Sequence, residues 1–160
     1  MKTMIKQLAL LTTGLLFAIT VWAHGDHQDN MAHLVFKKGA LHIHAQFPEA
    51  PMVGQEATLL LETHDPQTHQ VINIDDQIEV SLWMPSMGHG SAPTQIERVQ
   101  DDQGNVITGL YVVRNVYFTM GGDWEVRVTL TDAQGNKETQ SFNVHLDGGM
   151  NHGGGDHDHH

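Results

Sequence analysis

Apolar and polar residues alternate strictly along four stretches of the chain. In residues 41–47 the apolar side chains take every second position, and His42, His44 and Gln46 take the positions between them. The same period of two runs through residues 77–84, 124–131 and 142–146. Successive side chains of a strand point to opposite faces, so this alternation predicts half-buried β-strands.

Less regular apolar stretches and turn signals complete the pattern. Residues 57–63, 94–100 and 106–118 are further strand candidates, and Gly104-Asn105 and Gly135-Asn136 mark hairpin turns between neighbouring stretches. About seven short strands joined by such turns predict an all-β domain over residues 33–146, with the architecture of an immunoglobulin-like antiparallel β-sandwich. Trp124 falls on the apolar register and is expected in the core, whereas Trp83 falls on the outward register.

The first 23 residues follow a different pattern. Lys2 and Lys6 precede an uncharged apolar run at residues 8–21, and Ala23 ends the segment. This order of charge, apolar run and small residue is typical of a cleavable signal peptide. The run of 14 residues is shorter than the roughly 20 that span a bilayer. We therefore expect export and cleavage after Ala23, and a soluble periplasmic protein with no membrane insertion after cleavage.

Two polar segments flank the predicted sandwich. Residues 24–32 (HGDHQDNMA) are expected to form a flexible N-terminus that contains histidine. Residues 147–160 are rich in glycine and histidine and cannot bury a core, which predicts a disordered tail.

Composition narrows the class of partner. The formal net charge of the whole chain is −11, and loss of Lys2 and Lys6 with the signal takes it to −13 (−11 − 2). Nucleic acids and anionic membranes require a basic face, so this balance argues against them as partners and suits a cation. An acidic excess that only keeps an exported protein soluble is the alternative. The chain has 13 histidines against 8 lysines and arginines together, and no cysteine. Soft-metal binding would therefore use methionine sulfur, which resists oxidation outside the cytoplasm better than a thiolate does.

The densest cluster of metal-binding side chains is at residues 83–90 (WMPSMGHG). Pro85 should end the preceding strand, and Gly88 permits a sharp turn, so Met87 and His89 are expected on a loop beside Met84. Two thioethers and an imidazole suit Cu(I) better than zinc or calcium. Packing of Met84 in the core and a simple turn at Gly88 are the alternative interpretation of the same residues.

A second segment could complete this site. Met120 comes just before a two-glycine turn and Trp124, and is a third candidate sulfur ligand. Three motifs, Met84-Pro85-x-Met87-Gly88-His89-Gly90, Gly109-x-Tyr111 and Phe118-x-Met120-x-Gly122-x-Trp124, resemble the YtkA-like domain family and the related FixH-like domains. The resemblance covers about residues 50–146. It implies a small exported or membrane-tethered β-sandwich associated with copper handling.

Histidines supply separate candidate sites for Cu(II). Cleavage after Ala23 would leave His24 with a free amine, and His27, His33, His42 or His44 could complete a nitrogen site. His42 and His44 share a strand face with Cβ atoms about 6.5–7 Å apart. Solvated surface histidines are the alternative. His64, His69 and His145 have no evident partner in the sequence and are expected at the surface.

The tail offers weak ligands without fixed geometry. Its histidines are expected to gather Cu(II), Ni(II) or Zn(II) loosely near the domain. They are His152, His157, His159 and His160.

Motifs of common enzyme classes are absent from the sequence. It has no Gly-rich phosphate loop, no G-x-S-x-G and no H-E-x-x-H, and Asp75-Asp76 and Asp101-Asp102 are expected to be solvated turn residues. The sequence therefore predicts a protein that is not an enzyme and binds copper as a metallochaperone or sequestrant, with a membrane copper protein or oxidase as a further partner. One alternative is an interaction module that assists assembly of a membrane oxidase or transporter. Another is an oxidative copper enzyme built on His24.

Overall fold

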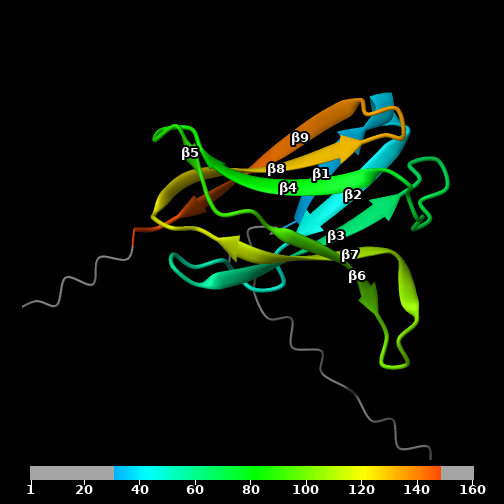
Figure 1. The fold of residues 1–160 in the computed structure, drawn as a ribbon, viewed down its shortest axis with the longest axis horizontal. Helices are drawn as coiled ribbons and strands as arrows, with labels where there is room; N and C mark the ends of the chain where they lie inside the picture. The colour runs from blue at the N-terminus through cyan, green and yellow to red at the C-terminus, as the bar shows by residue number, and fades with distance from the viewer. Residues whose placement is uncertain (1–30, 149–160) are drawn as a thin grey trace, which may run out of the picture.

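The computed structural model describes residues 31–148, which form two antiparallel sheets packed face to face (Figure 1). One sheet has five strands in the order β1-β2-β3-β7-β6, and the other has four in the order β5-β4-β8-β9. The strand bounds are β1 Met31–Phe36, β2 Leu41–Gln46, β3 Glu56–His64, β4 Gln77–Met84, β5 His89–Gly90, β6 Gln95–Gln100, β7 Val106–Tyr117, β8 Gly122–Thr131 and β9 Lys137–Leu146. A single 3-10 turn, η1 (Lys37–Gly39), joins β1 to β2.

This architecture confirms the predicted all-β sandwich. All seven predicted stretches form strands, and the structure adds two that the periodicity did not reveal, β1 and the two-residue β5. β5 is too short to show a period, and β1 begins at Met31, inside the polar-rich segment. Within residues 31–148 there is no helix with the length and apolar character that crossing a bilayer requires.

The core lies between the two sheets. Its largest fully buried side chains include Trp124, Phe36 and Phe118, and the rings of Phe118 and Trp124 meet edge to face with centroids 5.6 Å apart. Burying a side chain of this size contributes roughly 1.5–3 kcal/mol, so the alternating positions that supply the core also fix the register of each strand. Every outward-facing residue is thereby assigned to a definite face.

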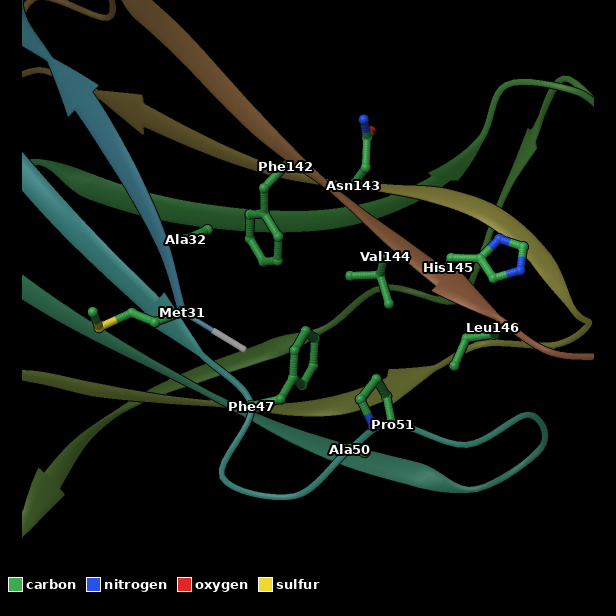
Figure 2. Close-up of a pocket in the computed structure, with 10 residues that line it drawn as sticks. All are labelled: Met31, Ala32, Phe47, Ala50, Pro51, Phe142, Asn143, Val144, His145 and Leu146. Atoms are coloured by element: carbon green, nitrogen blue, oxygen red, sulfur yellow. The ribbon is translucent and has the colours of Figure 1, made fainter. Parts of the chain in front are cut away.

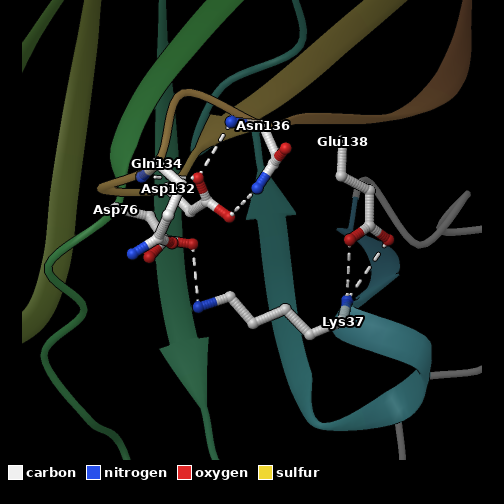
Figure 3. Close-up of polar contacts among 6 residues, drawn as sticks. All are labelled: Lys37, Asp76, Asp132, Gln134, Asn136 and Glu138. Carbon is white, nitrogen blue, oxygen red and sulfur yellow. Dashed lines mark hydrogen bonds and ion pairs between the residues drawn. The ribbon is translucent and has the colours of Figure 1, made fainter.

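Both predicted hairpin turns are present and have the same construction. In the turn between β8 and β9, Oδ1 of Asp132 accepts hydrogen bonds from the backbone N–H groups of Gln134 and Asn136 (Figure 3). The hydrogen bond from the Asn136 side chain, followed by these backbone bonds, holds the pKa of the Asp132 carboxyl below its ordinary value. Asp101 plays the same part in the turn between β6 and β7.

Polar contacts also tie the η1 turn to the four-stranded sheet. The Lys37 ammonium lies 2.8 Å from the Asp76 carboxylate, and the backbone N–H of Lys37 donates to the carboxylate of Glu138 on β9 (Figure 3). The Asp76 side chain is only 11% exposed, so its predicted role as a solvated turn acid is wrong. No local pattern indicates that a lysine from a distant turn pairs with this carboxylate.

A cleft of about 300 Å³ opens where the edge strands β1 and β9 approach each other (Figure 2). Phe47, Phe142 and Val144 supply much of its wall, and the imidazole of His145 lies at its end. The lining offers few polar side chains, so the cleft is chemically unlike the two clusters described next.

Candidate metal centres

The first cluster lies at one end of the four-stranded sheet and is called the methionine end: Met84, Met87, His89 and Met120. Met84 is the last residue of β4 and lies directly opposite His89, the first residue of β5. Residues opposite each other on antiparallel strands project to the same face. Met84 is 2% exposed and faces the core, so the half-buried His89 lies at the rim of the core beside it.

The connection between β7 and β8 meets this pair. The His89 ring contacts the Trp124 ring edge-on with centroids 6.2 Å apart, and the Trp124 indole N–H donates a 3.0 Å hydrogen bond to the Met120 carbonyl. The Cε methyl of Met84 reaches Gly122, where a Cβ atom would lie only 3.3 Å from it. His89 and the backbone of Met120 therefore contact Trp124, and Met84 reaches Gly122 on the same strand as Trp124.

Met87 occupies the turn between β4 and β5. The backbone N–H groups of Met87 and Gly88 both donate to the Met84 carbonyl, and Gly88 has a φ of 65°, which explains the glycine at this position. Met87 is 60% exposed and Met120 is 36% exposed. The methionine end thus has a buried thioether and a half-buried imidazole, with two accessible thioethers on the adjoining loops.

The second cluster lies on the outer face of the five-stranded sheet and is called the histidine patch: His33, His42, His44, Glu62 and His64. The strand register brings these residues together. His33 lies opposite His44, His44 opposite Glu62, and His42 opposite His64, across β1, β2 and β3. Intervening residues such as Ile43 and Thr63 point into the core.

The side chains of the histidine patch are in contact. The His33 and His42 rings share a 2.9 Å hydrogen bond, and Nε2 of His64 lies 2.6 Å from Oε1 of Glu62. The His44 ring lies between these two pairs, with centroids 5.0 Å from His33 and 4.4 Å from His64. One ligand atom from each of His44, Glu62 and His64 falls within 4.8 Å of the others.

The environment of His44 favours its neutral form. Partial burial, followed by the neighbouring His64 and His33 rings, lowers the pKa of His44 below its ordinary value of 6.5, and this outweighs the opposing effect of Glu62. A neutral imidazole is the form that binds a metal ion.

Sequence reasoning found part of the histidine patch and missed the rest. The pairing of His42 and His44 on one strand face is present. The prediction that His64 is a surface residue without a partner is wrong, because its side chain is only 15% exposed and contacts Glu62 and His44. Glu62 and His64 alternate with buried Leu61 and Thr63, so the sequence could predict that they share one face of a strand. It could not predict which strand lies beside them.

Other histidines have other surroundings. His145 is an exposed residue as predicted, but it has a partner, because its Nδ1 lies 2.7 Å from Asp123. That hydrogen bond and the charge of Asp123 raise the pKa of His145. His24, His27 and the tail histidines His152, His157, His159 and His160 lie outside the described residues.

Comparison with known proteins gives one assignment. No curated protein matches the chain. The family model described as YtkA-like matches residues 37–129, which include the whole methionine end and all of the histidine patch except His33. Since that match spans more than half of the 160 residues, the chain belongs to the YtkA-like family.

Proposed function

We propose that the protein is a copper-binding protein of the periplasm that holds Cu(I) at the methionine end, as a metallochaperone or as a sequestrant. The observation that carries this proposal is the direct pairing of Met84 with His89 on one face at the sheet end. Opposite residues of an antiparallel pair have Cβ atoms about 4.5–5.5 Å apart, so one ion can contact both side chains.

The donor chemistry supports copper. Thioethers bind hard, strongly hydrated ions poorly and select Cu(I), and imidazole also binds copper. Met87 is exposed on the turn that joins Met84 to His89, so it can close over an ion and open again. An accessible thioether suits a protein that takes up copper and passes it to a partner.

The site needs no thiolate, which agrees with an exported protein. The chain has no cysteine, and its first 23 residues have the composition of a signal peptide. Methionine and histidine keep their ligand atoms in an oxidising compartment, whereas cysteines form disulfides there.

Competition titration of the full chain with Cu(I) tests the proposal. Met87→Leu and His89→Gln should each weaken Cu(I) binding about tenfold or more, where each factor of ten is about 1.4 kcal/mol. Met52→Leu is the matched control, because Met52 is a 55% exposed methionine on the connection between β2 and β3, outside the strand pair that holds Met84 and His89. Equal Cu(I) affinity in the parent chain and the Met87→Leu/His89→Gln double variant would contradict the proposal.

One observation favours an interaction module as a second candidate function. Val106 and Ile107 are 47% and 40% exposed at the start of β7, and exposed apolar residues in adjacent positions are a common feature of protein interfaces. In that case Val106→Ser/Ile107→Ser would abolish the biological function, whereas Met87→Leu/His89→Gln would leave it intact. Copper tolerance of cells carrying each variant separates the two functions.

A further inference from the structure

The histidine patch is separate from the methionine end in sequence and in the fold. Its strands β1, β2 and β3 belong to the five-stranded sheet, whereas Met84 and His89 belong to the other sheet. We propose that the histidine patch is a second metal site, which takes a divalent transition-metal ion through His44, Glu62 and His64. This site stands independently of Cu(I) binding at the methionine end.

The distances within the patch suit one ion. Metal bonds to imidazole nitrogen and carboxylate oxygen are about 2.0–2.2 Å long, so two ligand atoms on one ion are separated by at most about 4.4 Å. The three ligand atoms lie within 4.8 Å of one another. Small side-chain rotations that move each ligand atom by a few tenths of an ångström would bring all three atoms onto one ion, and the strands need not move.

The strands hold these side chains in place. β2 is hydrogen-bonded on both sides, to β1 and β3, and the residues that alternate with the ligands are fully buried, including Ile43, Leu61 and Thr63. A ligand set on a rigid sheet loses little conformational freedom when the ion binds, which favours affinity. A chance group of solvated side chains on a mobile loop would lack this support.

His33 and His42 extend the set. They are hydrogen-bonded to each other, and the His33 ring lies beside His44. A metal-bound imidazole commonly uses its second nitrogen for a hydrogen bond that fixes its orientation, and neighbouring side chains supply such partners. His33 is exposed, so it can also turn toward the ion as a fourth ligand.

A small cavity adjoins two of the three ligands, His44 and Glu62. It has a volume of about 140 Å³ and is lined by His44, Glu62, Gln46, Leu60, Leu110 and the thioether side chain of Met31. This space accommodates a metal-bound water, whose share of volume is about 30 Å³. The ion therefore has a coordination position that protein nitrogen or oxygen does not have to fill.

The donor set indicates which ion binds. Two imidazoles and one carboxylate suit divalent ions of the first transition row, and affinity for such sites is highest for Cu(II), with Zn(II) below it. Calcium and magnesium prefer sets made only of oxygen. The histidine patch and the methionine end thus differ in the class of ion that they select.

Zn(II) titration followed by nuclear magnetic resonance tests the site residue by residue in the full chain. One equivalent should shift the ring signals of His44 and His64 and the amide signals around Glu62. His44→Gln/His64→Gln should abolish the amide shifts around Glu62 and weaken Cu(II) binding at the patch on the order of 100-fold, the upper end of what loss of an outer-shell partner costs. His69→Gln, at an exposed histidine outside the patch, should change neither.

Glu62→Gln provides a second variant that keeps the shape of the side chain while removing its charge. It should weaken Zn(II) binding roughly tenfold, and it decides the outcome if the double variant does not fold. Shifts confined to residues outside β1, β2 and β3, or a Zn(II) affinity unchanged by Glu62→Gln, would overturn the proposal. Loss of Cu(I) binding in the methionine variants would leave these results unaffected, so the two sites fail or stand separately.

Discussion

The methionine end and the histidine patch use one sandwich in two different ways. At the methionine end, the candidate ligands come from the ends of two paired strands and two loops, and Met87 and Met120 are accessible to solvent. In the histidine patch, they come from three adjacent strands with a hydrogen-bonded ladder and a buried core beneath them. The first arrangement favours exchange of an ion and the second favours a fixed geometry.

The comparison also separates two kinds of donor. Sulfur is concentrated at one end of the four-stranded sheet, and nitrogen with one carboxylate is concentrated on the outer face of the five-stranded sheet. Soft ions such as Cu(I) prefer the sulfur donors, and borderline ions such as Cu(II) and Zn(II) prefer nitrogen with carboxylate oxygen. A fold of this size can therefore keep two oxidation states of copper at separate places.

The largest expected effect is a difference in Cu(I) and Cu(II) affinity between variants of the two clusters. His44→Gln/His64→Gln should reduce Cu(II) binding on the order of 100-fold and change Cu(I) affinity less than about threefold, because distant sites act additively. Met87→Leu/His89→Gln should do the reverse. Competition titrations with both ions measure this, and a single variant that lowers both affinities equally would show that the sites are not separate.

Gly122→Ala should destabilise the methionine end alone. Gly122 has a φ of 121°, and an added Cβ would lie 3.3 Å from the buried methyl of Met84. Backbone strain of this kind costs about 1–3 kcal/mol, measurable by urea unfolding. Met84→Leu conserves volume and should cost less than about 1.5 kcal/mol while removing the sulfur.

Methyl signals distinguish a local from a global effect of Gly122→Ala. The signal of Met84 should move, and the ring signals of His44 and His64 should stay in place. A general shift of signals in both sheets would show that the two regions are not independent.

The smallest expected effect concerns the pKa values of two histidines, His44 in the histidine patch and His145 on β9. The pKa of His44 is lowered, so the unfolded chain binds more protons at this position, and His44 reduces stability as pH falls below 6.5. The pKa of His145 is raised, so its pair with Asp123 adds stability below pH 6.5 and loses it as pH rises through the raised pKa. Titration of ring signals without metal should place His44 below His145, and the opposite order would contradict both assignments.

The sequence predicted most of the fold because alternation is a local signal. Strands β2, β4, β8 and β9 each show it over several residues, and the glycine turns mark two hairpins. β5 was missed because two residues cannot show a period. β1 was missed because it begins at Met31 inside the polar segment at residues 24–32, and only pairing with β2 makes this stretch a strand.

The methionine end could be predicted for the same reason, since Met84, Met87 and His89 lie within six residues. The histidine patch could not be predicted in full. Glu62 and His64 are about 20 residues from His42 and His44, and they become neighbours only through the register of β2 with β3. Alternation predicts that Glu62 and His64 share one face of a strand, but no local signal predicts which strand pairs with it.

One titration series on a single labelled sample of the full chain tests the central claim most directly. Ag(I), a soft monovalent ion that undergoes no redox change here, is added first, and Zn(II) is added second. The account predicts that Ag(I) shifts the methyl signals of Met84 and Met87 and that Zn(II) shifts the ring signals of His44 and His64, each without moving the other set. If Ag(I) leaves Met84 and Met87 unchanged, copper binding at the methionine end is contradicted.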